Sequence, residues 1–243
     1  MSGPRSRKRR LSPFPRTPTA PAGRIGLLGG TLDPIHCGHL DAAVAARDAF
    51  RLDSVLIVPS RIPPHRPHQP AASPFHRFAM VALAVNGTPR LMAGDDELRA
   101  AGPSYTAETL DRLHRAGWSG SQIFFIIGAD AFAEIATWHR YPEVLDLASF
   151  VVVSRPGHGL DGLPRRLPAL ASRMRRVVSD AAASNPSIFL LDAATSDVSS
   201  TDVRQRLQRG ESIRGLVPLA VETHIRQHNL YQTVSANELH GQD

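Results

Sequence analysis

The sequence predicts an α/β fold in which a parallel sheet is flanked by helices. Short apolar runs of strand length alternate with stretches of helix length, which is typical of β-α-β units. The run at residues 123–127 is apolar at every position, as expected of a central strand covered on both faces. A glycine-rich turn follows the first apolar run. We therefore expect a ligand site at the carboxyl ends of the strands.

The first unit comprises a strand at residues 25–28, a helix ending near residue 50 and a second strand at 54–58. Parallel strands joined through a helix predict a right-handed crossover. Ser73 is a predicted N-cap, with Pro74 as the first residue of a helix that reaches about residue 85.

The remaining elements follow from similar patterns. Residues 158–186 hold five arginines and no clear periodicity, which predicts a partly helical, exposed segment. Strands are expected at residues 91–93, 123–127, 150–153 and 188–191, and helices through residues 109–113, 200–210 and 217–230.

Length and charge predict one domain with tails. A chain of 243 residues, 42% hydrophobic and 21% charged, can bury a sizeable core. Six of its 28 basic residues lie within residues 1–23, which leaves 22 basic residues against 22 acidic ones. The net charge of +6 therefore belongs to the amino-terminal segment. We expect a disordered basic Pro/Arg-rich tail at 1–23, a single domain at 24–235 and a carboxyl-terminal tail at 236–243.

Composition also predicts the compartment. One cysteine excludes an internal disulfide and fits a reducing cytoplasm. No apolar run approaches the roughly 20 residues of a membrane helix, and the charged start lacks the apolar segment of a secretory signal. A cytoplasmic protein without membrane association is therefore expected.

Residues 29–39, with the sequence GGTLDPIHCGH, predict a phosphate site. The glycines let the backbone approach an anion, and the helix start that follows favours negative charge. His36 and His39 can lie on one side of this turn, where they would stabilise charge during phosphoryl or nucleotidyl transfer. An ordinary turn with structural histidines is the alternative. If His36 and His39 were metal ligands, the site would need a third ligand. No such residue stands at the spacing of a known zinc motif, so we predict no protein metal site.

This segment resembles the signature of the nucleotidylyltransferase superfamily with the His-x-Gly-His motif, although Leu32 replaces the commoner phenylalanine. The resemblance implies a Rossmann-like nucleotidylyltransferase fold and nucleotidyl transfer with release of pyrophosphate. Further segments resemble the bacterial nicotinate mononucleotide adenylyltransferases. They are PPHR at residues 63–66, GPSYT at 102–106, RPG at 155–157 and SSTDVR at 199–204.

The resemblance assigns roles to individual residues. For some of them the chemistry of the side chain supports the same role. Ser199 or Ser200 can cap a predicted helix, and Ser200, Thr201 and Arg204 at the start of that helix form a second anion cradle. Asp130 follows a buried strand and can accept a ribose hydroxyl. The catalytic candidates are His36 and His39. The ATP-binding candidates are Gly29, Gly30, Thr31, His36, His39, Gly128, Asp130, Ser200, Thr201 and Arg204. The substrate-binding candidates are His65, Arg66, Thr106, Trp138 and Arg155. Relatives often carry arginine where Ala100 stands, one position beyond Arg99.

The implied partners are ATP and nicotinate mononucleotide, joined to give nicotinate adenine dinucleotide (deamido-NAD) in NAD biosynthesis. Mg²⁺ is expected to arrive with ATP, because no carboxylate cluster predicts a dedicated site. Nicotinamide mononucleotide, phosphopantetheine or glycerol phosphate are alternative acceptors. An RNA-associated binding module that uses the basic tail, or a metal-dependent phosphohydrolase, would be a different kind of protein. Deletion of residues 1–23 distinguishes these alternatives, because an enzyme would keep its activity and a tail-dependent RNA-binding module would lose its function. The sequence does not predict the oligomeric state.

Overall fold

The computed structural model describes residues 23–64, 70–157, 159–176 and 185–232. Its centre is a seven-stranded sheet with the order β3-β2-β1-β4-β5-β7-β6. All neighbouring strands run parallel, which confirms the predicted sheet. The strands are β1 (Ile25–Gly30), β2 (Ser54–Pro59), β3 (Leu91–Ala93), β4 (Ile123–Gly128), β5 (Ser149–Val153), β6 (Met174–Arg176) and β7 (Ile188–Leu191).

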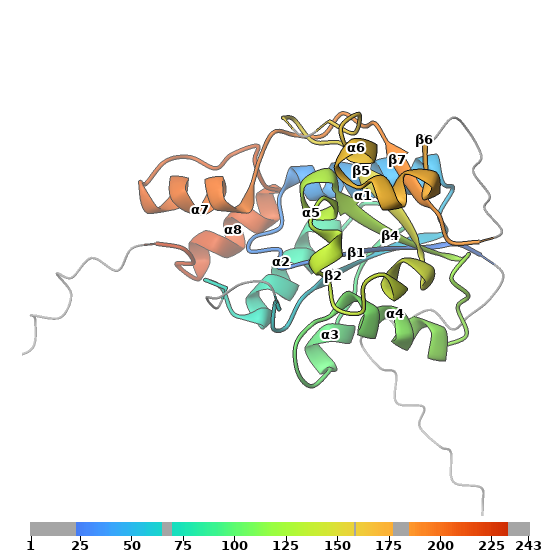
Figure 1. Ribbon diagram of the computed structural model, residues 1–243. Coiled ribbons are helices and arrows are strands. Elements are labelled where there is room, and N and C mark those ends of the chain that lie inside the picture. Colours follow the sequence, from blue (N-terminus) through green and yellow to red (C-terminus); the bar gives the residue numbers. More distant parts are fainter. Residues whose placement is uncertain (1–22, 65–69, 158, 177–184, 233–243) are drawn as a thin grey trace, which may run out of the picture.

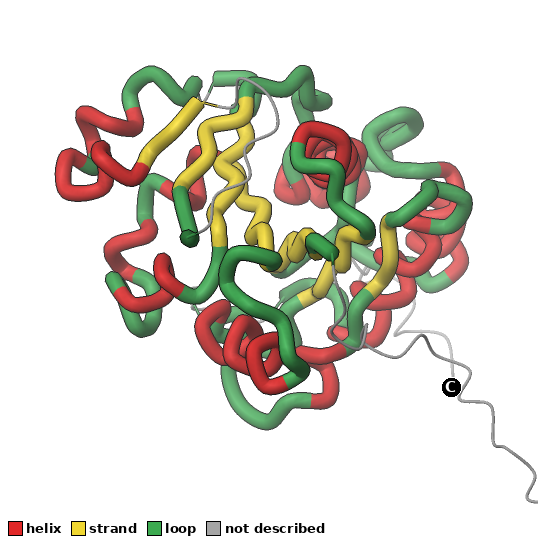
Figure 2. The backbone as a smooth tube through the Cα atoms, turned by 90° about the vertical axis from the view of Figure 1, so that its right-hand side faces the viewer, coloured by secondary structure: helices red, strands yellow, loops and turns green. Residues whose placement is uncertain are grey.

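Helices cover both faces of this sheet, as Figures 1 and 2 show. The longer ones are α1 (Cys37–Ala49), α2 (Pro74–Val85), α4 (Thr106–Arg115), α7 (Ser200–Gln208) and α8 (Leu219–Gln227). The short helical turns are α3 (Asp96–Arg99), α5 (Ala129–Phe132), η1 (Ile135–Thr137), η2 (Glu143–Asp146), α6 (Leu163–Arg166) and η3 (Pro168–Arg173). Within the described ranges, no helix combines the length and the apolar character needed to cross a membrane.

The strands are apolar on both faces because each face packs against its own helical layer. Leu28, Ile57 and Ile126 belong to one core cluster, together with buried residues of α1, α2, α7 and α8. Leu27, Leu56 and Phe125 point the other way and pack against α4, α5, η1, η2, α6 and η3. Successive residues of a strand alternate between faces, so a continuous apolar run supplies both clusters.

Two predicted helix starts are confirmed by their caps. The Ser73 hydroxyl accepts a hydrogen bond from the backbone N–H of His76 at 3.2 Å, with Pro74 at the first helical position. Ser199 caps α7 in the same way, accepting from the N–H of Asp202 at 3.0 Å. Ser200, the other predicted cap, is thereby left for a different contact.

The segment at residues 158–186 differs in part from its prediction. It contains α6 and η3, and it also supplies the edge strand β6 beside β7. Leu163 and Leu170 are buried in the core, so the segment is not uniformly exposed. The pattern of the sequence did not predict β6, because two of its three residues are arginines and not the apolar residues expected of a strand. Residues 158 and 177–184 of this segment are outside the described ranges, as are nearly all of the predicted tails.

The sheet also fixes where the site lies. β1 and β4 are neighbours at its centre, and the strand order reverses between them, with β2 and β3 on one side and β5 to β7 on the other. In open α/β sheets, ligands bind in the crevice that such a reversal leaves at the carboxyl ends of the strands. The predicted phosphate-binding turn lies at the carboxyl end of β1, and the predicted ATP residues Gly128 and Asp130 lie at that of β4.

Candidate active site

The two predicted catalytic histidines lie together where the chain passes from β1 to α1. His36 is the N-cap of α1, and its ring centroid is 3.7 Å from that of His39. The backbone N–H of His36 donates to Nδ1 of His39 at 3.3 Å. Because Nδ1 of His39 is the acceptor, a neutral His39 carries its proton on Nε2. The expected pair is therefore present, and His39 has an N–H donor left for a ligand.

Burial keeps both imidazoles neutral. It lowers the pKa of His36 to about 3, with a further lowering from Arg155 and an opposing effect from Asp41. Burial also lowers the pKa of His39 well below its usual value, helped by His36 and Arg155. Two neutral imidazoles can donate N–H groups to phosphate but bring no charge. The positive charge of the site must then come from guanidinium groups.

Gly38 makes room for the His36 ring. A side-chain carbon at this position would lie 3.3 Å from Cε1 and Nδ1 of His36 and 3.0 Å from the carbonyl oxygen of Ser196. The ring is buried, and its Nδ1 has no hydrogen-bond partner among the described residues. The glycine of the motif therefore has a packing reason here, in addition to its place at a helix start.

Asp33 lies within the glycine-rich turn, and its carboxylate joins this turn to two other segments of the chain. Its carboxylate accepts hydrogen bonds from the backbone N–H groups of Ala71 at 2.8 Å and Ala72 at 3.1 Å. The hydroxyl of Tyr231, beyond the end of α8, donates to the same carboxylate at 2.7 Å. Burial and the Asp33 carboxylate raise the pKa of Tyr231, so this hydroxyl stays protonated as a donor.

Arg77 of α2 is fully buried and holds the same turn through hydrogen bonds to backbone carbonyl groups. Its guanidinium donates to the carbonyl oxygens of Thr31 at 2.7 Å and Ser60 at 2.6 Å. It also donates to those of Ala72 at 3.1 Å and Arg61 at 3.4 Å. One side chain of α2 therefore joins the ends of β1 and β2 to the segment that leads into α2.

The second predicted anion cradle touches the first. Ser200 donates from its hydroxyl to the carbonyl oxygen of Pro34 at 2.8 Å. Arg204 donates to the carbonyl oxygen of Asp33 at 2.6 Å and to the Thr201 hydroxyl at 3.2 Å. Residues about 170 positions apart thus meet at one place, as expected of two corners that hold one triphosphate.

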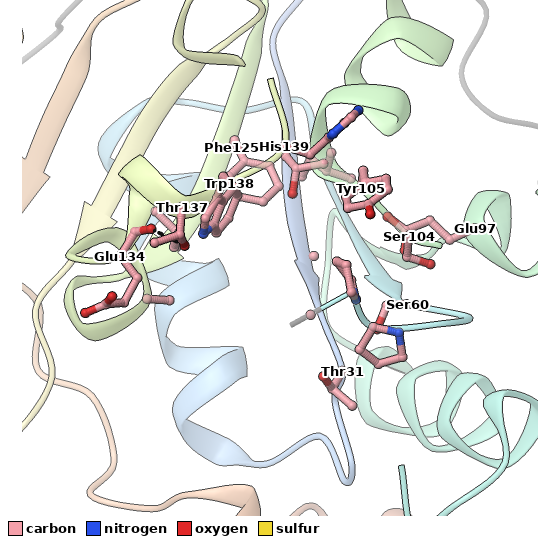
Figure 3. A pocket seen from close by; sticks show the side chains of 18 residues that line it. Thr31, Ser60, Glu97, Ser104, Tyr105, Phe125, Glu134, Thr137, Trp138 and His139 are labelled. Carbon is pink, nitrogen blue, oxygen red and sulfur yellow. Dashed lines mark hydrogen bonds between the residues drawn. The ribbon is translucent and has the colours of Figure 1, made fainter. Parts of the chain in front are cut away.

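An aromatic pocket of about 440 Å³ opens beside the glycine-rich turn. We use this name for the cavity between Gly30 and Thr31 at one end and Trp138 at the other (Figure 3). Trp138 packs edge-on against Phe125 with centroids 5.9 Å apart, and Tyr105 stacks on His139 at 4.2 Å. The predicted substrate residues Thr106 and Trp138 both line this pocket.

Two loops build the wall of the aromatic pocket opposite Trp138. The Ser104 hydroxyl accepts from the backbone N–H of Arg61 at 2.8 Å, and the N–H of Ser104 donates to the carbonyl of Ile62 at 2.9 Å. Pro63 and Pro64 continue this wall. The predicted His65 and Arg66, which follow directly, lie outside the described residues.

Arg155 lies elsewhere than its predicted group. It does not line the aromatic pocket; it lines a second hollow of about 370 Å³, here named the arginine hollow, together with Asp130, Ser199 and Asp202. Gly128 permits this arrangement, because a side-chain carbon there would lie 2.5 Å from Asp130 Oδ1 and 3.2 Å from Arg155 Nε. Arg155 thus lies beside the predicted ATP residue Asp130 and outside the aromatic pocket, and its role in binding the acceptor substrate stays a prediction.

Comparison with known proteins identifies the family. The cytidylyltransferase-like family model matches residues 27–206. A protein of Desulfatibacillum aliphaticivorans, named probable nicotinate-nucleotide adenylyltransferase, is 39% identical over 86% of this chain and 99% of its own. A protein of a Roseiflexus species with the same name is 42% identical over 86% of this chain and 98% of its own. The chain belongs to the nicotinate-nucleotide adenylyltransferase family.

The fold agrees with that membership. A Plasmodium falciparum nicotinic acid mononucleotide adenylyltransferase, solved in complex with NaAD, superposes with a TM-score of 0.65 at 16% identity. It covers 86% of this chain and 97% of its own. At this identity the likeness shows the Rossmann-like nucleotidylyltransferase fold alone.

Family motifs led to the residues that face the cavities but missed those that hold them in place. Asp33, Arg77 and Tyr231 were not among the candidates. Glu97 is a further residue that was not predicted. Its buried carboxyl lines the aromatic pocket and accepts a hydrogen bond from the Thr109 hydroxyl at 2.7 Å. Burial raises the pKa of Glu97. Arg99, whose role was open, forms an exposed ion pair with Asp95 at 2.5 Å and lines neither cavity.

Proposed function

We propose that this protein transfers the adenylyl group of ATP to nicotinate mononucleotide, forming nicotinate adenine dinucleotide and pyrophosphate. The observation that carries this proposal is the direct contact between the two anion cradles, Ser200 to Pro34 and Arg204 to Asp33. The aromatic pocket, lined by Gly30 and Thr31, and the arginine hollow, lined by Ser199 and Asp202, each have room for one nucleoside or pyridine group.

The ligands are arranged by the chemistry of the two cavities. The nicotinate ring occupies the aromatic pocket, where Trp138 offers a face for stacking. Adenosine extends toward the arginine hollow, where the Asp130 carboxylate accepts hydrogen bonds from ribose hydroxyls. The triphosphate lies between them, over the amides of Gly30 and Thr31 and beside the histidine pair.

The reaction needs alignment and charge stabilisation more than a base. An oxygen of the acceptor's 5′-phosphate attacks the α-phosphorus of ATP, and the bond from that phosphorus to the bridging oxygen of pyrophosphate breaks. The attacking phosphate is already ionised, so no proton has to be removed. His36 and His39 donate N–H groups to the transferring phosphate, while Arg155 and Arg204 offset its negative charge.

Magnesium enters this proposal as a companion of ATP. The described residues place no group of three metal-ligating side chains at the triphosphate position. An ion there would take most of its ligands from phosphate oxygens and water, as Mg²⁺ commonly does, and the carboxylates that line the arginine hollow are Asp130, Asp197 and Asp202. When bound, it would neutralise charge on the phosphates.

A competition between acceptors tests the proposal. Purified protein receives ATP with nicotinate mononucleotide, nicotinamide mononucleotide, phosphopantetheine or glycerol phosphate, and pyrophosphate release is followed. The expected result is the highest kcat/KM with nicotinate mononucleotide and identification of the dinucleotide as product. A higher kcat/KM with any other acceptor, or phosphate release without dinucleotide, would refute the assignment.

A further inference from the structure

Three histidines gather where α2 packs against α8. His76 lies in the first turn of α2, His224 lies on α8, and His228 is the residue that ends α8. One ring nitrogen of each lies within 4.8 Å of the corresponding nitrogens of the other two. Nδ1 of His76 and Nε2 of His224 are 3.1 Å apart.

We propose that His76, His224 and His228 form a binding site for a zinc ion that joins α2 to α8. In a tetrahedral zinc site with bonds of about 2.0–2.1 Å, two ligand nitrogens lie roughly 3.3 Å apart. The His76 and His224 nitrogens are already close to that separation. The ligand nitrogens of all three rings lie within 4.8 Å of one another, and the exposed His228 is the ring with most freedom to move closer.

The helices bring these residues together for reasons visible in the chain. His224 and His228 are four positions apart, the spacing that places two side chains on one face of a helix. His76 comes from a different helix, held by the packing of Met80 and Val81 of α2 in the same core as Val221 and Ile225 of α8. A local pattern could therefore predict two ligands, but only the packed helices supply the third.

The three imidazole ligands determine which metal ions this site would bind. Three imidazoles suit zinc and its neighbours in the transition series, whereas Mg²⁺ and Ca²⁺ require oxygen ligands. Each imidazole binds in its neutral form, with its proton on the ring nitrogen that faces away from the ion. The hydrogen bond between His76 and His224 is replaced by two metal bonds: the ring that donated it shifts this proton to its other ring nitrogen, so the chain loses no proton overall. The exposed side of the cluster leaves the fourth position to water.

A zinc ion here would fasten the glycine-rich turn indirectly. His76 precedes Arg77, which holds the Thr31 and Ser60 carbonyls. His228 lies three positions before Tyr231, which holds Asp33. The proposed ion is therefore a structural clasp between the two helices that anchor the turn, and it takes no part in adenylyl transfer. This site departs from the absence of a protein metal site that we expect from the sequence.

Metal binding is measured on the full-length protein without a polyhistidine tag, after treatment with a chelator. Calorimetry with ZnCl₂ should show one ion per chain, and Co²⁺ should give the visible absorption of a tetrahedral site. Zn²⁺ at 100-fold excess over its Kd should raise Tm by roughly 5 to 10 °C. MgCl₂ should do none of this.

Variants separate this cluster from the other nitrogen and sulfur ligands of the chain. His228→Gln and the double variant His224→Gln/His228→Gln should weaken Zn²⁺ binding, the double variant by at least about 100-fold. Gln227→Ala, an exposed neighbour on the same helix, and His39→Gln in the catalytic pair should bind as the unchanged protein does. Equal Zn²⁺ affinity in the unchanged protein and the double variant would overturn the proposal. Loss of binding in His39→Gln alone would do the same, because it would move the ion to the catalytic pair.

Discussion

The hydroxyl of Tyr231 donates a hydrogen bond of 2.7 Å to Oδ1 of Asp33, across 198 positions of the chain. Tyr231 follows the closing helix, and Asp33 lies within the turn that carries His36. The two backbone N–H groups ahead of α2 bind the same carboxylate. The end of the described chain therefore helps to position the histidine pair that lies at its beginning.

Tyr231→Phe should lower both stability and affinity for ATP. A hydrogen bond to a charged group contributes roughly 1.5–3 kcal/mol, so Tm should fall by about 3 to 12 °C. KM for ATP should rise more than kcat falls, because the turn loses an anchor while the histidines remain. Tyr141→Phe is a matched control, because the Tyr141 hydroxyl has no hydrogen bond to the described residues, and its change should stay within about 0.5 kcal/mol. Equal Tm values for the two variants would argue against this role of Tyr231.

Arg77→Met should be the most destabilising of these changes. It leaves four carbonyl oxygens without their shared donor, and each unsatisfied buried group costs about 1–3 kcal/mol. A loss of about 3 kcal/mol or more in the free energy of unfolding is expected from denaturant titration. Arg77→Lys should recover part of it, since an ammonium group reaches fewer carbonyls. Arg209→Lys, in an exposed ion pair with Glu211, should change little. The interpretation fails if Arg77→Met is as stable as Arg209→Lys.

His39→Ala should lower kcat by about 10² to 10³ with a small effect on KM, as for other lost transition-state donors. His39→Gln offers a sharper comparison, because its amide nitrogen can take the place of Nε2. If a neutral N–H donor is what the reaction requires, the glutamine variant should be faster than both His39→Ala and His39→Asn in steady-state assays. Three equally slow variants would indicate that the site needs an imidazolium instead.

Gly128→Ala should weaken ATP binding while leaving the fold intact. The backbone of Gly128 is extended, with a φ of −71°, so alanine causes no backbone strain there. Its methyl group would displace Asp130 and Arg155 in the arginine hollow. Loss of one charged hydrogen bond corresponds to roughly a tenfold rise in the Kd for ATP, measured by calorimetry. Gly162→Ala has open space around the new carbon and serves as the control. An unchanged Kd in Gly128→Ala would remove the arginine hollow from the ATP site.

The buried His36 should make the protein less stable in mild acid. Its pKa is about 3 in the folded protein, below the ordinary value of 6.5 that it takes when unfolded. Between these values the unfolded chain binds the extra proton, so stability is complete above about pH 6.5 and declines as the pH falls. The decline due to His36 is about 1.4 kcal/mol per pH unit between pH of about 6 and 4. Chemical denaturation of the protein and of His36→Gln at several pH values measures this difference in slope. Parallel curves would contradict the neutral, buried state of His36.

Much of the fold could be predicted because its signals are local. The apolar run of β4, the Ser73-Pro74 start of α2 and the caps of α7 each depend on neighbouring residues, and the structure confirms them. The edge strand β6 could not be predicted, because it is short and arginine-rich and exists through pairing with β7. The motif that contains Arg155 fixes its position in the chain, but only the structure shows that Arg155 lines the arginine hollow and not the aromatic pocket.

The sequence by itself determined that this is a parallel α/β protein, and it predicted a phosphate-binding turn with two histidines and a second anion cradle. Those features follow from side-chain periodicity, glycine and capping residues, which act over a few positions. Only the tertiary structure decided that Tyr231 would hold Asp33, that Arg77 would join two strand ends, and that His76 would meet His224 and His228. Each of these contacts joins elements far apart in the chain, and their distances depend on how whole helices pack against the sheet.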